Sequence, residues 1–150
     1  MAMRIETPTA AELPRLVDIW EAAVRATHDF LPEADLQLIK PLLISQYFPN
    51  VQLICIRDEQ GEIAGFGGYA DGKVEMLFVA PEAHGKGLGK ALLHDAINRL
   101  GATEVDVNEQ NPKAVAFYLN QGFEVTGRSP LDGGGRPFPI LHLKLAAHRD

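Results

Sequence analysis

Residues 77–90 read LFVAPEAHGKGLGK: an apolar segment typical of a strand, then Pro81, then three glycines at alternate positions. Apolar residues follow at helical spacing, so a helix is predicted to begin at these glycines and to end at Gly101. Glycine loses more conformational freedom on folding than any other residue, so three together need a reason. One interpretation is an anion-binding loop, where backbone N–H groups of the helix start point at a phosphate. The other is a flexible turn that happens to be rich in glycine.

Two common phosphate-binding motifs fit this loop poorly. A P-loop fails, because Gly89-Lys90 is followed by Ala91 and the upstream glycine position holds His84. A Rossmann fingerprint would place its third glycine at Lys90, although Asp106 has the spacing of its ribose-binding acid. The antiparallel strands predicted upstream are also wrong for the start of a Rossmann fold.

The segments before the loop predict two helices and then three antiparallel strands. Thr9 and Glu12 have the spacing of a capping box, which predicts a helix from Ala10. Asp71-Gly72 is a dipeptide favoured in two-residue hairpin turns. The predicted elements are a short strand at 3–6, the helix from Ala10, a weaker helix at 33–44 that could bend at Pro41, and strands at 51–57, 63–70 and 74–79.

The segments after the loop predict a strand, a helix and a final pair of strands. Asn111 with Pro112 predicts a helix start, and Gly122 predicts where that helix closes. The predicted strands are 104–107, 123–127 and 138–145, with a loop at 129–136. The whole order predicts one α/β domain over residues 1–150.

Composition excludes several classes of protein. The chain has 150 residues, 46% hydrophobic and 23% charged, which is typical of a globular domain. Its formal charge of −6 disfavours a nucleic-acid binder. No apolar segment is long enough to predict a membrane span. The histidines are scattered along the chain, so no metal site is predicted. The single Cys55 excludes an internal disulfide and suits a cytoplasmic protein.

Two motifs resemble those of the GNAT superfamily of N-acetyltransferases. The first is the 77–90 stretch, which is similar to the family's acetyl-CoA signature Gln/Arg-x-x-Gly-x-Gly/Ala, with His84 where Gln or Arg is usual. The second runs from Asn111 through Ala114 and Tyr118 to Gly122-Phe123, and resembles Asn-x-x-Ala-x-x-x-Tyr…Gly-Phe. The resemblance covers nearly the whole chain. It implies the GNAT fold, an α/β architecture with a mixed central sheet, a splayed strand pair and helices on both faces.

The resemblance also implies roles for particular residues. Tyr118 would protonate the departing thiolate, although it could instead be a core aromatic. Asn111 would contact the pantetheine arm, although it could serve only as a helix N-cap. The residues implied to bind acetyl-CoA are Leu77, Phe78, Val79, His84, Gly85, Lys86, Gly87, Leu88, Gly89, Lys90 and Asn111.

The acceptor side is less explicit. Glu75 is a candidate base, because it lies two residues before Leu77 and would share its sheet face; a solvent-facing carboxylate is the alternative. His28 lies in a Thr-His-Asp-Phe-Leu segment that resembles a bacterial GNAT subgroup, where it would line the acceptor pocket. Asp132 and Arg136 flank three glycines in a loop that could close over substrate, or could be a long hairpin connection. The remaining histidines, His94 and His142, are expected to be structural or exposed.

The predicted function is transfer of an acetyl group from acetyl-CoA to a primary amine of unspecified identity, by direct attack in a ternary complex. A covalent intermediate is not required, and Cys55 is a poor nucleophile candidate. Two alternatives stay open: a non-catalytic acyl-CoA sensor on the same fold, and a tRNA acetyltransferase, which the acidic composition disfavours.

Overall fold

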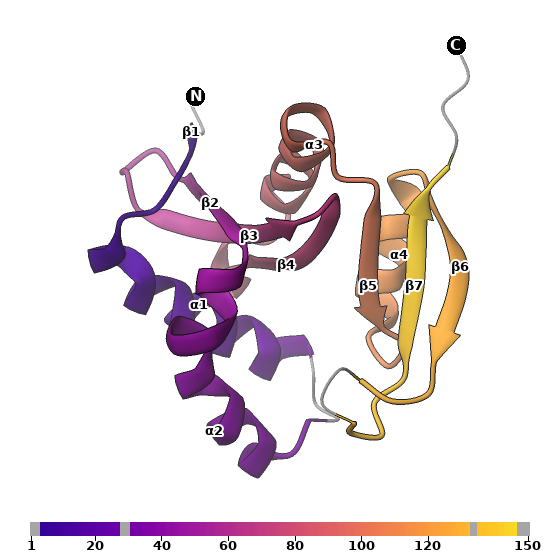
Figure 1. The fold of residues 1–150 in the computed structure, drawn as a ribbon. Coiled ribbons are helices and arrows are strands. Elements are labelled where there is room, and N and C mark those ends of the chain that lie inside the picture. The colour runs from indigo at the N-terminus through magenta and orange to yellow at the C-terminus, as the bar shows by residue number, and fades with distance from the viewer. Residues whose placement is uncertain (1–3, 28–30, 133–134, 147–150) are drawn as a thin grey trace. The chain divides into compact units, whose positions relative to one another are not determined.

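A computed structural model describes residues 4–27, 31–132 and 135–146, and the chain folds as two compact units, 1–102 and 103–150 (Figure 1). The first unit contains, in order, β1 (Arg4–Glu6), a 3₁₀ turn (Ala10–Glu12), α1 (Leu13–Thr27), α2 (Glu33–Leu42), a π-helical turn (Leu43–Tyr47), a 3₁₀ turn (Phe48–Asn50), β2 (Gln52–Arg57), β3 (Ile63–Ala70), β4 (Lys73–Val79), a 3₁₀ turn (Pro81–Ala83) and α3 (Leu88–Leu100). The second contains β5 (Glu104–Asn108), α4 (Pro112–Asn120), β6 (Phe123–Ser129) and β7 (Ile140–Leu145).

In the first unit, β1 to β4 pair antiparallel in chain order, which confirms the three antiparallel strands predicted between residues 51 and 79 and adds β1 at the edge. Helices α1 and α3 cover opposite faces of this sheet (Figure 1). On the α3 side, the Tyr69 hydroxyl donates a hydrogen bond to the Leu92 carbonyl at 3.2 Å. On the other side, the fully buried Phe66 ring packs edge-on against Phe48 at 5.8 Å. Each face of the sheet is therefore covered by a helical layer.

The predicted capping box is confirmed. The Thr9 N–H donates to Glu12 Oε1 at 2.9 Å, and the helix proper begins after one 3₁₀ turn. Glu12 also pairs with Arg57, whose Nη1 lies 2.9 Å from Glu12 Oε2 and whose Nε lies 2.7 Å from Glu6 Oε1. The network joins the start of α1 to β1 and β2. Hydrogen bonds from Arg57 hold the pKa of Glu6 below its usual range and lower the pKa of Glu12 to about 2.

This network predicts an acid-sensitive contribution to stability. Carboxylates whose pKa is depressed in the fold bind protons more readily when unfolded, so stability is lost as pH falls from about 5 toward about 2. Arg57→Met removes the cause. We expect the variant to be less stable at pH 7 and its stability to fall less steeply between pH 5 and pH 3, in urea unfolding at each pH.

The matched control is Arg4→Met, because Arg4 pairs only at 3.4 Å with Glu6 and its side chain is 58% exposed. Exposed ion pairs contribute little, so the control should follow the wild-type curve. Parallel curves for wild type and Arg57→Met would show that this network does not govern acid stability.

Backbone irregularities occur at several places in the first unit, including a register shift between β2 and β3 at Ile56 and Arg57. The register between β3 and β4 shifts between Gly68 and Tyr69, because Glu75 is an extra residue in β4 between two paired ones. The predicted hairpin turn is confirmed, with φ of 53° at Asp71 and 80° at Gly72. The predicted helix at 33–44 is confirmed as α2, and it ends in a π-helical turn just after Pro41, which has no N–H to donate.

In the second unit, β7 lies between β5 and β6 and pairs antiparallel with both. The side chains of Val105, Val107, Phe123 and Leu143 are buried, and α4 contacts both β5 and β6. Ser129 was expected in a loop, but it pairs with Ile140 at the end of β6, so β6 is longer than predicted and β7 begins two residues later. Of the described helices, none is both long and apolar enough to cross a bilayer.

Candidate functional site

The glycine loop presents an uncapped helix start. Gly85 and Gly87 have φ of 84° and 76°, values that side-chain-bearing residues seldom adopt. Gly87 is the N-cap of α3 and has no side chain with which to cap the first N–H groups of the helix. A Cβ placed on either glycine would meet no atom within 4 Å. The positive φ values therefore account for glycine at both positions, and the bare backbone leaves the start of α3 open to an approaching anion.

The other residues predicted to bind acetyl-CoA differ in how far their side chains are exposed to solvent. His84 and Lys90 are exposed, Gly89 is half-buried, and Leu88 is buried at the start of α3. Before the loop, Leu77, Phe78 and Val79 are half-buried residues of β4 that pair with Gly67, Phe66 and Gly65 of β3. Their proposed contact with acetyl-CoA stays a prediction.

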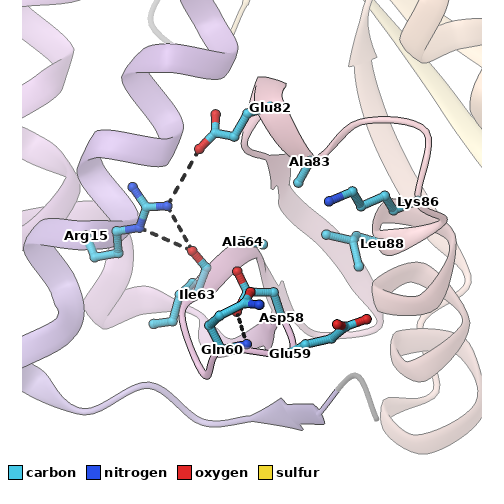
Figure 2. A pocket seen from close by; sticks show the side chains of 10 residues that line it. All are labelled: Arg15, Asp58, Glu59, Gln60, Ile63, Ala64, Glu82, Ala83, Lys86 and Leu88. Carbon is cyan, nitrogen blue, oxygen red and sulfur yellow. Dashed lines mark hydrogen bonds and ion pairs between the residues drawn. The ribbon is translucent and has the colours of Figure 1, made fainter. Parts of the chain in front are cut away.

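A hollow of about 270 Å³ lies beside this loop. Figure 2 shows Arg15, from α1, with its guanidinium beside the Ile63 carbonyl, to which it donates two hydrogen bonds of 3.2 and 3.0 Å. Glu82 Oε2 lies 4.0 Å from Arg15 Nη2. Lys86, from the glycine loop, lines the hollow on the side opposite Arg15 (Figure 2).

Asn111 and Tyr118 lie on α4 in the second unit. The Asn111 side chain accepts a hydrogen bond from the Ala114 N–H at 3.2 Å, which confirms the N-cap interpretation and is compatible with a further contact. Tyr118 is buried, with its ring edge-on to Phe117 at 5.1 Å and to Phe123 at 5.8 Å. Burial raises the pKa of the Tyr118 hydroxyl, so the residue stays protonated well above neutral pH.

Of the predicted acceptor residues, Glu75 lies in the first unit, and Asp132 and Arg136 lie in the second. Glu75 is exposed and occupies the bulge of β4, so the strand alternation that would align it with Leu77 is interrupted there. Bulges often redirect a side chain next to an active site. His28 lies outside the described residues. Asp132 and Arg136 bond to each other: Asp132 Oδ1 accepts from the Arg136 N–H at 2.8 Å, and Arg136 Nη1 lies 3.8 Å from Asp132 Oδ2.

Cys55 lies fully buried in β2, and burial raises the pKa of its thiol. Because the thiolate is the nucleophilic form, this supports the expectation that Cys55 takes no part in the chemistry. Within the described residues, no group of three potential metal ligands is found.

The structure reveals a polar cluster that was not predicted. His142 Nδ1 lies 2.7 Å from Asp106 Oδ1, and His142 Nε2 lies 2.7 Å from Ser129 Oγ. His142 was expected to be structural or exposed; its side chain is 38% exposed and held on both ring nitrogens. The only sequence signal was a polar residue alternating with apolar ones in both β5 and β7, which does not reveal that the two strands pair.

Comparisons with known proteins agree with this fold. The profile of a family described as "Acetyltransferase (GNAT) domain" matches residues 31–139. The chain is 37% identical over 143 residues to the peptidyl-lysine N-acetyltransferase YjaB of Salmonella typhimurium, covering 95% of this chain and 98% of that protein. It is 30% identical to the peptidyl-lysine N-acetyltransferase YiaC of Escherichia coli, covering 77% and 79%.

Solved structures show the same similarity. The solution structure of apo YjaB from Escherichia coli matches with a TM-score of 0.89 and 34% identity, over 99% of this chain and 100% of that one. The PaiA N-acetyltransferase of Thermoplasma acidophilum, in complex with coenzyme A, matches with a TM-score of 0.72 over 96% and 99% of the two chains. At 21% identity, that second likeness concerns the fold alone.

Proposed function

Since this chain belongs to the GNAT superfamily of acetyltransferases, we propose that it transfers the acetyl group of acetyl-CoA to the side-chain amine of a lysine in a protein. The choice of acceptor rests on the full-length relative from Salmonella typhimurium, which is named a peptidyl-lysine N-acetyltransferase. The choice of cosubstrate rests on the open, uncapped helix start at Gly87, which is the observation that carries the proposal. We also propose that the reaction takes place in the cytoplasm, because a chain whose single cysteine is buried and unpaired suits a reducing compartment.

On the cofactor side, the N–H groups at the start of α3 bind the pyrophosphate of acetyl-CoA. The absence of side chains at Gly85 and Gly87 lets the phosphates approach the backbone closely. Lys86 and Lys90 add positive charge to a chain whose formal charge is −6. A structural relative bound to coenzyme A and another bound to acetyl-CoA, from Salmonella typhimurium, share the fold and support this choice of ligand.

In the proposed reaction, the neutral amine attacks the thioester directly in a ternary complex. The C–N bond forms as the C–S bond breaks, and the thiolate leaves as coenzyme A. Tyr118 donates a proton to that thiolate, because it is the buried, protonated phenol of the matching motif. The matching Asn111 would contact the pantetheine arm through the part of its amide that the helix cap leaves unused.

We expect the protein to acetylate a peptide that has one internal lysine and a blocked amino terminus. Mass spectrometry of the peptide after incubation with acetyl-CoA measures one added acetyl group per lysine. Controls are the same peptide with arginine in place of lysine, and the mixture without protein, because acetyl-CoA modifies lysine slowly by itself.

Acetylation confined to free peptide amino termini or to small amines would contradict the choice of acceptor. Tight binding of acetyl-CoA without product on any amine would instead favour the non-catalytic sensor.

A further inference from the structure

Ser129, His142 and Asp106 form a chain of hydrogen bonds across three strands of the second unit. An ionised carboxylate only accepts hydrogen bonds, so the His142 ring donates from Nδ1 to Asp106 Oδ1 at 2.7 Å. In the neutral ring, Nε2 then carries no proton and accepts from the Ser129 hydroxyl, also at 2.7 Å. The proton of Ser129 therefore points at a nitrogen that is able to take it.

A β-bulge brings Ser129 to the face of the sheet that carries His142. The register shifts between Val125 and Gly127, so Thr126 is an extra residue in β6. Side chains alternate along a strand, so if the pairing before Thr126 continued without the extra residue, Ser129 would point to the other face. The Thr126 hydroxyl donates to the His142 carbonyl at 3.2 Å and so ties the bulge to β7. Bulges often redirect a side chain next to an active site.

Ser129 lies at an edge of the sheet, where a small molecule can reach it. Among the described strands, β6 pairs only with β7, and Ser129 is its last residue. Ser129 is half-buried, and the side chains of His142 and Asp106 are 38% and 31% exposed. Ile140, directly opposite Ser129 on β7, is also half-buried and offers an apolar contact to a bound molecule.

This face of the sheet lies away from α4. Val105 and Val107 are buried on the face of β5 toward α4, whereas Asp106 alternates with them and points to the other side. Tyr118 lies on α4, so the serine is separate from the residue proposed to protonate the thiolate. A reaction at Ser129 is therefore distinct from acetyl transfer.

We propose that Ser129 is a nucleophile, activated by His142 and positioned through Asp106, which is acylated by small carboxylic esters that carry no negative charge. A serine hydroxyl is a weak nucleophile unless a base takes its proton during the attack. The three residue types, their order of contact and the ring nitrogens that they use match the triad of serine hydrolases. The structure thus assigns to this face a second reaction, ester hydrolysis through an acyl-serine.

The reaction has two steps. In the first, Ser129 Oγ bonds to the ester carbonyl carbon and its proton moves to His142 Nε2; the C–O bond to the alcohol breaks, and the alcohol leaves with that proton. In the second, water attacks the acyl-serine and gives one proton to His142. The carboxylic acid departs, and Ser129 Oγ takes the proton back. Asp106 stays ionised and holds the imidazolium formed in each step.

The charges on this face determine which esters are favoured. Register and alternation place three carboxylates and one ammonium group around His142, namely Glu104 and Asp106 on β5, Glu124 on β6 and Lys144 on β7. With the ring neutral, the surplus charge is negative. Anionic molecules, acetyl-CoA among them, are repelled, whereas neutral and cationic esters are not.

The test is incubation with p-nitrophenyl acetate, a neutral ester with a good leaving group. We expect peptide mass spectra to show an acetyl group on Ser129 and none on Ser45, an exposed serine whose hydroxyl bonds to the Pro41 carbonyl and not to a base. In His142→Gln, acylation of Ser129 should be about a hundredfold slower, with folding checked by thermal melting. No acetyl group on Ser129 of the wild type, or an unchanged rate in folded His142→Gln, would overturn the proposal.

A pH profile tests the base without any substitution. Histidine changes protonation near neutral pH, and only the neutral ring accepts the serine proton. Acylation of wild-type Ser129 should therefore slow about tenfold for each pH unit below about 6. A rate that does not change between pH 7 and pH 5 would contradict the role of His142.

Asp106 is tested as a positioning residue. Asp106→Asn should slow acylation about tenfold or more and move the midpoint of the pH profile to lower pH, because the imidazolium loses its negative partner. Asp106→Glu should recover part of the rate. A wild-type rate and midpoint in Asp106→Asn would show that the carboxylate does not position the ring.

The choice of ester is tested with the mono-p-nitrophenyl ester of succinic acid, which has the same leaving group and one negative charge. Each rate is divided by that of the same ester with free imidazole, which corrects for intrinsic reactivity. At low salt, the anionic ester should acylate Ser129 about threefold more slowly than the acetate, and added salt should reduce the difference. Equal corrected rates at low salt would overturn the choice of ester.

Discussion

Gly87→Asp is expected to lower affinity for coenzyme A by about a hundredfold or more, equivalent to roughly 2.7 kcal/mol. The variant places a carboxylate at the open helix start, where the pyrophosphate is proposed to bind, and so adds a like charge as well as bulk. The fold should survive, because no atom lies within 4 Å of the new Cβ and a negative charge is favourable at a helix N-terminus. Calorimetric titration with coenzyme A measures the loss, and Gly87→Ala reports the steric part alone.

Gly101→Asp is a matched control at the other end of the same helix. Gly101 has φ of 74° against 76° at Gly87, and its Cβ position is equally open. Both variants carry the same left-handed strain, but a carboxylate at the helix C-terminus is unfavourable. Gly101→Asp should therefore be the less stable protein and still bind coenzyme A normally. Equal loss of affinity in both variants would show that instability, and not the loop, is responsible.

Tyr118→Phe is expected to reduce kcat about a hundredfold, at the lower end for loss of a general acid. A coenzyme A thiolate has a modest proton affinity, near that of a cysteine thiolate at about 8.5, so the acid is helpful without being essential. The raised pKa of Tyr118 makes proton donation costlier still. Phenylalanine keeps the ring contacts to Phe117 and Phe123, so the KM for acetyl-CoA should stay within about twofold.

Tyr69→Phe is the control for this substitution, because Tyr69 is also buried and its hydroxyl bonds to the Leu92 carbonyl. It should lose about 1 kcal/mol of stability and no activity.

The burial of Tyr118 provides a second measurement, the pH dependence of stability. The pKa of Tyr118 in the fold lies above its unfolded value of about 10. The contribution of the protonated Tyr118 to the free energy of unfolding is therefore fully present below pH 10 and is lost as the pH rises above it. Tyr118→Phe should lose stability less steeply above pH 10; wild-type turnover in this variant would make Tyr118 a packing residue only.

Features encoded within a few residues could be predicted from the sequence. The Thr9–Glu12 capping box, the Asp71-Gly72 turn and the Asn111 cap each depend on neighbours at most three positions away, and the structure contains all of them. The glycine loop was predicted for the same reason, because glycines just before an amphipathic helix permit the positive φ that the turn at Gly85 and Gly87 adopts. These local signals, in their order along the chain, were sufficient to identify the family and the fold.

Features that depend on strand pairing could not be predicted. Asp106 and His142 are 36 residues apart, and only the register of β5 and β7 brings them together. Ser129 was assigned to a loop because nothing near it signals that β6 continues. The bulge at Glu75 arises from a register shift between β3 and β4, which has no composition of its own. The polar cluster of Asp106, Ser129 and His142 was missed because its residues are neighbours only after the sheet forms.

Because Cys55 is buried, the native protein should react very slowly with thiol reagents. Its side chain has no exposed surface, and the raised pKa keeps it in the unreactive thiol form. A colorimetric thiol reagent added during turnover therefore counts coenzyme A and not the enzyme. A cysteine introduced at an exposed position such as Glu59 could likewise carry a fluorophore or spin label selectively, with no need to remove the natural one.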